Sequence, residues 1–469
     1  MIVNPNIFRA YDIRGVYPDD LNEKVASRIA LAFALLYPGA KKIVLARDSR
    51  LSSPALAKAI TGALIGAGKE VIDIKIAPDP LFYFSIFYYR FDGGIMISGS
   101  HNPKEYNGLT LNIRKSKKEQ SHDVIGEGLV RIKGLVTSEK EFKLSPRKGK
   151  ITQLNPENDY IRQVKRKIRL KKPLKIIIDS GNGAMGFFPE RVFRNLGCKI
   201  KTLYGEFDGN FPYHLPDPYL EDNLKDIKQA VVKNKADLGF SYDCDGDRVA
   251  LIDNLGRTVN GDFCLLMLAN QAIGKKKGPI VHCMRVSKAF LDEMQKQGVK
   301  TYFSISHHSA VIDKILKTKA IFGGEVTMHF FFPGDYYLCD DALFASLKLA
   351  EIASGLTSLA EFVDGLPHYS ASPEIFIDTP DEEKFKIIKR LQDYLRKNRY
   401  NFIDVDGARI NFNHGWALAR AANTTPIIKC RFEGDTKPHL IEIERKALAI
   451  FKKVGIPVTK RTYRELGLA

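Results

Sequence analysis

Three aspartates at alternate positions form the chemically most suggestive pattern in the chain. Asp243, Asp245 and Asp247 lie in the run Asp-Cys-Asp-Gly-Asp-Arg. Three carboxylates this close repel one another unless a cation lies between them. Oxygen ligands suit a hard divalent cation, and the glycine falls too early for an EF-hand. A solvated acidic turn is the plain alternative. Because apolar strands are expected on both sides, we favour a Mg²⁺ site that also takes a phosphate oxygen.

A second pattern is the small turn Ser98–Pro103, which follows the apolar run Ile95–Ile97. It is expected to present the Ser100 hydroxyl and backbone N–H groups at the carboxyl end of a strand. Open α/β sheets bind ligands at that edge. A plain polar turn is the alternative.

Two further loops combine polar side chains suited to a phosphosugar. Gly323–His329 offers a carboxylate, a hydroxyl and an imidazole that could bind sugar hydroxyls. Arg420–Pro426 offers a guanidinium, an amide and hydroxyls, which together suit a phosphate. Each loop is weak evidence by itself. Four arginines near the start of the chain add positive charge: Arg9, Arg14, Arg47 and Arg50.

The run Gly181–Gly186, with Glu206 about 20 residues further on, matches the dinucleotide-binding pattern. A tight strand-to-helix turn produces the same spacing. Since no group for hydride transfer is evident, we favour the turn.

Short apolar runs alternate with helical stretches along the first 330 residues or so. Lys42–Ala46, Ser53–Gly66 and Val71–Ile76 read as strand, helix and strand, and similar units begin at Lys175 and Pro279. This rhythm predicts an α/β fold with mixed, largely parallel sheets. The last hundred residues read instead as hairpin-like strands, among them Ile403–Phe412, flanked by helices, which predicts an α+β domain.

Composition excludes several classes of protein. The chain has 469 residues and a formal net charge of +18, which favours anionic partners. The basic run Arg162–Lys172 carries apolar residues at helical spacing, so we expect an amphipathic helix and no nucleic-acid partner. Six cysteines without a C-x-x-C pair, no signal-peptide pattern and no apolar run of membrane length predict a cytoplasmic protein without a membrane partner.

In this order and spacing the loops resemble those of the α-D-phosphohexomutase family, over nearly the whole chain. Phe8–Gly15, Arg47–Arg50, Ser98–Gly108 and Asp179–Gly183 match its motifs, as do the three loops further on. The resemblance implies three related α/β domains and a C-terminal α+β domain around a central cleft. With boundaries near Ser145, Asp253 and His368, the expected domains are 1–145, 146–253, 254–368 and 369–469, which contain the phosphoserine, metal, sugar and phosphate loops in turn.

The resemblance also implies the reaction: interconversion of hexose 6-phosphate and hexose 1-phosphate, of mannose or glucose, through a phosphoserine. Hexose 1,6-bisphosphate is the expected intermediate and activator, Mg²⁺ the cofactor, and a monomer or small homo-oligomer the expected form. The catalytic residues implied are Ser100, His101, Arg248, His308 and His329. The substrate ligands implied are Arg9, Tyr11, Arg14, Glu325, Thr327, Arg420, Asn423 and Thr424. The metal ligands implied are Ser100, Asp243, Asp245 and Asp247.

Three positions depart from the family pattern. Thr110 and His282 stand where lysine is usual, and Ala422 stands where serine is usual. Thr110 lacks a basic group for proton transfer, and Ala422 lacks a hydroxyl donor. A catalytically weakened relative that binds phosphosugars in regulation or assembly is therefore the alternative hypothesis, although Ser100 and the aspartates favour the enzyme.

Overall fold

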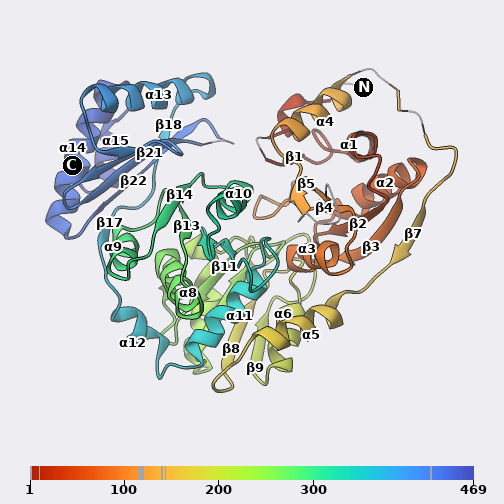
Figure 1. The fold of residues 1–469 in the computed structure, drawn as a ribbon, viewed down its shortest axis with the longest axis horizontal. Coiled ribbons are helices and arrows are strands. Elements are labelled where there is room, and N and C mark those ends of the chain that lie inside the picture. Colours follow the sequence, from red (N-terminus) through yellow and green to blue (C-terminus); the bar gives the residue numbers. More distant parts are fainter. Residues whose placement is uncertain are drawn as a thin grey trace. The chain divides into compact units, whose positions relative to one another are not determined.

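The computed structural model describes residues 3–9, 11–114, 121–138, 141–142, 144–422 and 425–468. They form two compact units, and Figure 1 shows their elements. Unit 1 comprises Met1–Leu268 and Thr327–Asp364, and unit 2 comprises Ala269–Val326 and Gly365–Ala469. Among the described helices, none has the length and hydropathy that crossing a membrane requires.

The first sheet of unit 1 has the strand order β1-β5-β4-β2-β3-β7, with β6 beside β5. Its strands are β1 (Ile13–Val16), β2 (Lys42–Arg47), β3 (Glu70–Ile76), β4 (Gly93–Ile97), β5 (Tyr106–Arg114), β6 (Ser121–Asp123) and β7 (Lys150–Gln153). β4 pairs in parallel with β2 and antiparallel with β5. Every residue of β4 is buried, as expected for a strand covered on both faces. β7 extends this sheet past the predicted boundary at 145, which stays a prediction.

Helices cover the first sheet: α1 (Glu23–Leu36), α2 (Ser53–Gly66), α3 (Asp79–Tyr88) and α4 (Glu127–Thr137). Asn22 caps α1 by accepting a hydrogen bond from the N–H of Val25, and Pro54 lies in the first turn of α2. The first N–H groups of a helix have no partner within the helix. Asn22 provides a partner for one of them, and Pro54 has no N–H group to bond. The helix starts are thus set by local sequence, and α2 matches its predicted bounds.

The second sheet of unit 1 has the order β12-β11-β10-β8-β9. Its strands are β8 (Lys175–Asp179), β9 (Lys199–Leu203), β10 (Leu238–Tyr242), β11 (Val249–Ile252) and β12 (Thr258–Val259). The surrounding helices are α5 (Glu157–Lys167), α6 (Phe188–Asn195) and α7 (Lys225–Lys233), and α8 (Gly261–Lys275) leads out of this unit. β16 (Phe330–Phe331), α11 (Ala342–Ala353) and α12 (Leu359–Asp364) complete unit 1. β10 and β11 form an antiparallel pair around the aspartate loop.

Unit 2 begins with three parallel strands, β13 (Ile280–Cys283), β14 (Thr301–Ser304) and β15 (Phe322–Gly324). Two helices accompany them, α9 (Lys288–Lys296) and α10 (His308–Thr318). An antiparallel sheet follows, with the order β17-β22-β21-β20-β19 and β18 beside β22. Its strands are β17 (Ser370–Ala371), β18 (Ile375–Asp378), β19 (Phe402–Ile403), β20 (Ala408–Phe412), β21 (Gly415–Ala421) and β22 (Ile427–Gly434), and its helices are α13 (Asp381–Lys397), α14 (Lys437–Lys453) and α15 (Lys460–Glu465).

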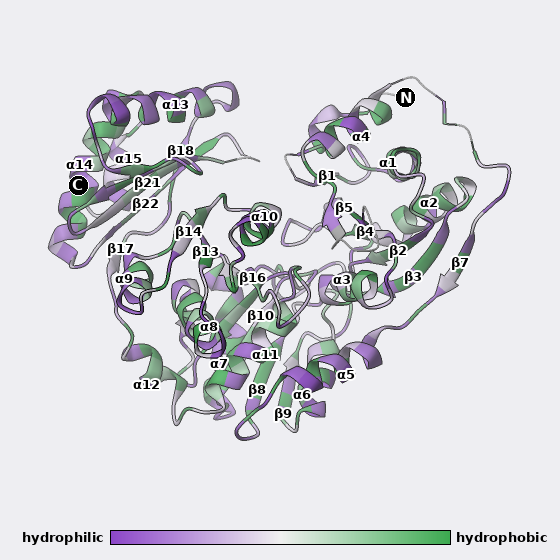
Figure 2. Ribbon diagram, in the orientation of Figure 1, coloured by the Kyte–Doolittle hydropathy of each residue, from purple (hydrophilic) through white to green (hydrophobic). Residues whose placement is uncertain are grey.

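The α/β class with a C-terminal α+β part is confirmed, and two details are corrected. The single strand expected over Ile403–Phe412 is two strands, because Gly407 at φ +86° allows a turn between them. The basic run is helical only as far as Lys167. As expected of an amphipathic helix, α5 buries Val164 and exposes Lys165–Lys167. Figure 2 shows hydrophobic residues along β3 and β8 and hydrophilic ones along α13. The six cysteines are all buried and free.

Candidate active site

Asp243 shapes the loop between β10 and β11. Its Oδ1 accepts hydrogen bonds from the backbone N–H groups of Gly246, Asp247 and Arg248, at 2.9, 3.1 and 3.2 Å. The loop turns sharply at Gly246, which has φ +75°. Because one oxygen of Asp243 is engaged in this turn, its Oδ2 is the atom that faces away from the loop backbone.

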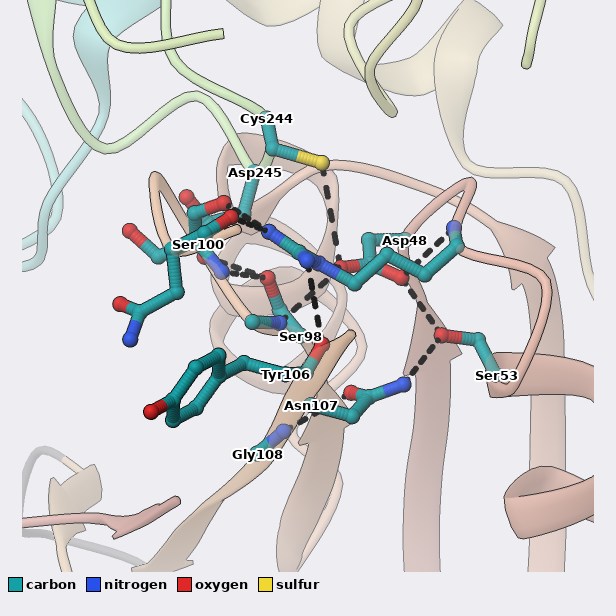
Figure 3. A network of polar contacts seen from close by, with 12 residues as sticks. Asp48, Ser53, Ser98, Ser100, Tyr106, Asn107, Gly108, Cys244 and Asp245 are labelled. Carbon is teal, nitrogen blue, oxygen red and sulfur yellow. Dashed lines mark hydrogen bonds and ion pairs between the residues drawn. The ribbon is translucent and has the colours of Figure 1, made fainter. Parts of the chain in front are cut away.

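Ser100 lies in the turn after β4, as the sequence predicts. Its Oγ is 3.5 Å from Oδ2 of Asp243 and 3.0 Å from Nδ1 of His101. Ser98 Oγ donates to Asp245 Oδ2 at 2.7 Å, and Figure 3 shows these side chains together. The structure thus brings the predicted nucleophile and the predicted metal ligands into one buried cluster.

The backbone N–H groups of the serine turn are arranged differently from our expectation. The N–H of Gly99 donates to Asp48, and that of Ser100 donates to Ser98 Oγ. The N–H of Asn102 donates to the carbonyl of Gly99. All three donors are bonded within the protein, so the expected set of N–H groups pointing outward is not found in these residues.

The three aspartates fit a divalent cation. One carboxylate oxygen from each of Asp243, Asp245 and Asp247 lies within 4.8 Å of the others. Oδ1 of Asp245 is buried and has no hydrogen-bond partner among the described residues. Burial, followed by repulsion from Asp247, raises the pKa of Asp245 to about 6, and the same two effects raise the pKa of Asp243 well above its usual range. A divalent cation would remove this strain, and an all-oxygen donor set suits Mg²⁺.

Arg248 and His329 extend this cluster. Nε of Arg248 donates to Nε2 of His329 at 3.0 Å and lies 3.7 Å from Asp247. Nδ1 of His329 lies 3.4 Å from Asp340. Burial alone lowers the pKa of His329, but Asp247 and Asp340 together raise it above its usual value. A neutral His329 with its proton on Nδ1 fits both contacts.

Of the other predicted residues, His101 lies within the serine turn and Arg14 lies beside it. Repulsion from Arg248, then burial, lowers the pKa of His101 to about 2, so its ring is neutral. Nη1 of Arg14 donates to Asn102 Oδ1 at 2.6 Å and to the carbonyl of Gly99 at 3.2 Å. Arg9 contributes a backbone N–H bond to Asp12 at the entrance to β1.

The other predicted substrate ligands are divided between the two units. Tyr11 and Thr327 are half-buried in unit 1. In unit 2, Arg420 forms an ion pair with Asp406 at 3.4 Å, and Asp406 accepts the N–H of Ser306 at 3.1 Å. This links the predicted phosphate loop to the segment before His308.

His308 is the first residue of α10, and Glu325 is buried directly after β15. Asn423 and Thr424 lie outside the described residues.

The three departures from the family pattern lie within strands or at a strand end. Thr110 is half-buried in β5, opposite Met96. Ala422 is buried and donates its N–H to the carbonyl of Ile427. His282 is buried in β13 against Phe303, and burial lowers its pKa to about 3. A neutral, buried imidazole is poorly suited to replace a phosphate-binding lysine.

Sequence reasoning missed how the glycine run Gly181–Gly186 is used. A side chain at Gly183 would approach Cα and O of Cys244 to 2.8 Å, and the N–H of Ala184 donates to the carbonyl of Cys244. The run therefore supports the aspartate loop. Arg50, which the sequence suggests as a source of positive charge and as part of a family motif, is completely buried against Asp48. The two-residue spacing of Asp48 and Arg50 gave no signal of this role.

Comparison with known proteins places the chain in a family. Four models of phosphoglucomutase/phosphomannomutase match it: alpha/beta/alpha domain I at 5–125, domain II at 158–256, domain III at 260–369 and the C-terminal domain at 374–449. It is 34% identical to a phosphomannomutase/phosphoglucomutase of Pseudomonas syringae over 97% of each chain. It is 30% identical to a phosphoglucomutase of Neisseria gonorrhoeae, over 96% of this chain and 97% of the relative.

A solved structure of a family protein from Burkholderia thailandensis has a TM-score of 0.89 and 29% identity, and the match covers 98% of this chain and 99% of that one. The chain therefore belongs to the phosphoglucomutase/phosphomannomutase family. It is a phosphosugar mutase, an intramolecular phosphotransferase, and the regulatory alternative is not favoured.

Proposed function

We propose that the protein interconverts hexose 6-phosphate and hexose 1-phosphate through a phosphoserine at Ser100. The observation that supports this most directly is the 3.5 Å approach of Ser100 Oγ to Asp243, within a cluster of three buried carboxylates. A nucleophile beside a cation site is the arrangement that phosphoryl transfer requires.

The transfer proceeds in two halves. In the first, a sugar hydroxyl attacks the phosphorus of phosphoserine, the bond to Ser100 Oγ breaks, the sugar hydroxyl loses its proton, and Ser100 Oγ takes up a proton. The sugar is then a 1,6-bisphosphate. In the second half it presents its other phosphate, whose bond to the sugar oxygen breaks as Ser100 Oγ loses its proton and is phosphorylated again, and the sugar oxygen takes up a proton. No net phosphate is consumed, so hexose 1,6-bisphosphate is both intermediate and activator.

Each residue of the cluster has a role in this scheme. Asp243, Asp245 and Asp247 would hold Mg²⁺, which when bound offsets charge on the transferred phosphoryl group. Arg248 stabilises the same charge. We assign proton acceptance to Nε2 of His329, which requires that its hydrogen bond from Arg248 be released. His101 is neutral and orients the Ser100 hydroxyl at 3.0 Å.

Several roles stay predictions from the resemblance: the catalytic part of His308 and the substrate contacts of Arg9, Tyr11, Arg14, Glu325, Thr327, Arg420, Asn423 and Thr424. The relatives named phosphomannomutase/phosphoglucomutase support glucose and mannose phosphates as the substrates. We propose both, with no preference for an aminated sugar. The four domains with boundaries near 145, 253 and 368, and the monomeric or small oligomeric form, are likewise proposed.

A coupled assay tests the reaction. Glucose 1-phosphate or mannose 1-phosphate, with a trace of the matching 1,6-bisphosphate and Mg²⁺, should yield the 6-phosphate. Peptide mass spectrometry of protein incubated with the bisphosphate should place one phosphate on Ser100 and none on Ser98, which provides an internal control in the same peptide. Turnover without any phosphate on Ser100 would contradict the covalent mechanism.

A further inference from the structure

Arg50 is a fully buried guanidinium whose five N–H groups all have acceptors in the serine turn and its surroundings. Nε donates to Asp48 at 3.0 Å. The remaining four donate to backbone carbonyls, those of Ser100 at 2.7 Å, Asn102 at 2.6 Å, Pro103 at 2.6 Å and Tyr106 at 3.0 Å. Arginine has five such donors in a fixed plane, whereas lysine has three on one atom. No other side chain could make this set of bonds.

The absence of a side chain at Gly99 leaves the space that the guanidinium of Arg50 occupies. A Cβ on Gly99 would lie 2.5 Å from Nε and 2.6 Å from Cζ of Arg50. The plane of the guanidinium therefore lies directly against the turn, at the residue before Ser100. The φ angle of Gly99 is not in the left-handed region, so its backbone conformation does not require glycine. The close contact with Arg50 does.

The backbone at Ser100 is in an unfavourable conformation. Its φ is +47°, in the left-handed region that residues with a Cβ seldom occupy. Such a conformation persists only where the surroundings over-determine it, and it is common at functional sites. Arg50 bonds to the carbonyls of Ser100 and Asn102, which follow this strained φ angle in the chain, and Asp48 accepts the N–H of Gly99, which precedes it.

Asp48 connects the same turn to the aspartate loop. Its Oδ2 accepts the N–H of Gly99 at 3.0 Å and faces the thiol of Cys244 at 3.8 Å. Its Oδ1 accepts the N–H of Arg50 and the hydroxyl of Ser53. Figure 3 shows Asp48 between Ser53, Cys244 and the serine turn. Both loops of the cluster thus contact a single buried carboxylate.

We infer that Arg50 and Asp48 are positioning residues that hold Ser100 in its strained conformation and in register with the aspartate loop. Within the described part of the chain, neither side chain bonds to the carboxylates of the three aspartates, and both act through the backbone. The inference rests on the proposed function, because it gives Ser100 the covalent role.

Arg50→Lys tests this inference, since it keeps a cation opposite Asp48 but can replace at most three of the five bonds. The measurement is the rate at which glucose 1,6-bisphosphate phosphorylates Ser100, followed by rapid quench and mass spectrometry. The rate is divided by the amount of protein that becomes phosphorylated at the end of the reaction, so that unfolded protein does not count. Misplacement of a reacting atom by about 1 Å can cost about 10²-fold in rate. We expect a decrease of that size, with KM for glucose 1-phosphate within about twofold of the parent.

Two companion variants make the result decisive. Lys69→Met removes another buried cation of unit 1 that donates to backbone carbonyls, those of Tyr37, Pro38 and Ala40. It controls for lost stability and should keep the parental rate per phosphorylatable molecule. Gly99→Ala displaces the guanidinium without removing it and should reproduce the slow transfer.

The outcomes are distinct. Parental transfer rates in both Arg50→Lys and Gly99→Ala overturn the inference, and so does an equal loss in Lys69→Met. Should Arg50→Lys fail to fold, Gly99→Ala decides alone by the same rate. A parent that is never phosphorylated on Ser100 contradicts the proposed function instead, which is a different result.

Discussion

Gly183→Ala should damage catalysis through backbone contact, although Gly183 is neither a metal ligand nor a predicted substrate ligand. The new Cβ would lie 2.8 Å from both Cα and O of Cys244, whereas ordinary van der Waals contact begins at 3.4 Å, so the aspartate loop has to yield by about 0.6 Å. The loop cannot simply swing away, because the N–H of Ala184 donates to the carbonyl of Cys244 at 2.6 Å. Asp243 and Asp245 flank Cys244 and must move with it.

The expected magnitudes follow from that displacement. Overpacking of this kind typically costs about 1–3 kcal/mol of stability. A shift of about 0.6 Å in two carboxylates that hold the cation should lower kcat by about 10-fold to 10²-fold. It should also raise the Mg²⁺ concentration needed for half-maximal activity. KM for the phosphosugar should change little.

The assay is steady-state turnover across a Mg²⁺ titration, with thermal unfolding of the same samples. Gly62→Ala is the matched control, since a Cβ at Gly62 in α2 meets nothing within 4 Å. Gly62→Ala should keep full activity. Its free energy of unfolding should rise by about 0.5–1 kcal/mol, because alanine is more stable than glycine within a helix. If Gly183→Ala shows parental turnover and an unchanged Mg²⁺ requirement, the glycine run does not support the aspartate loop as we argue.

Three other outcomes are expected. Asp245→Asn should cut turnover by about 10²-fold or more and weaken Mg²⁺ binding, measured by titration calorimetry, because a charged ligand is lost; full activity in chelator would refute the metal role. Thr110→Lys should raise kcat by up to about 10²-fold if a general base is missing at β5; a decrease at saturating bisphosphate would leave that role to His329. Burial raises the pKa of Glu444 to about 7, so the parent loses stability as pH rises from about 4.5 through 7. Glu444→Gln should therefore be more stable than the parent by about 1–2 kcal/mol at pH 8, after allowance for solvent screening, and the gain should vanish near pH 4, as measured by denaturant unfolding.

The sequence was sufficient to predict residues whose chemistry shows in a short run. Asp243–Asp247 and the Ser100 turn were predictable because clustered charge and a glycine-flanked hydroxyl after a strand are typical of functional sites. The strands around them were predicted from apolar runs, whereas the order of the strands within each sheet was not predicted. Their proximity, with Ser100 Oγ 3.5 Å from Asp243, was expected from the family resemblance and is present in the structure.

Residues that act through distant backbone were not predictable in this way. The guanidinium of Arg50 donates to carbonyls up to 56 residues away, and carbonyls are common to every residue. The pattern of side chains along the sequence therefore does not predict the bonds between Arg50 and these carbonyls. His282 shows a related limit: imidazole can bind phosphate, and only its burial against Phe303 shows that it is not available here.

The bonding of the serine turn has a consequence for how charge is managed. The sequence predicts backbone N–H groups that could stabilise a phosphate on Ser100, but those of Gly99, Ser100 and Asn102 are bonded to Asp48, Ser98 and Gly99. In the proposed mechanism, cations near the turn would offset the charge of a phosphate on Ser100. Arg14 and Arg248 are nearby protein cations, and three carboxylates are placed to recruit a divalent ion. Because the phosphate has to leave Ser100 as readily as it arrives, a site without a dense set of fixed N–H donors suits this proposed reaction, since such donors would favour one state.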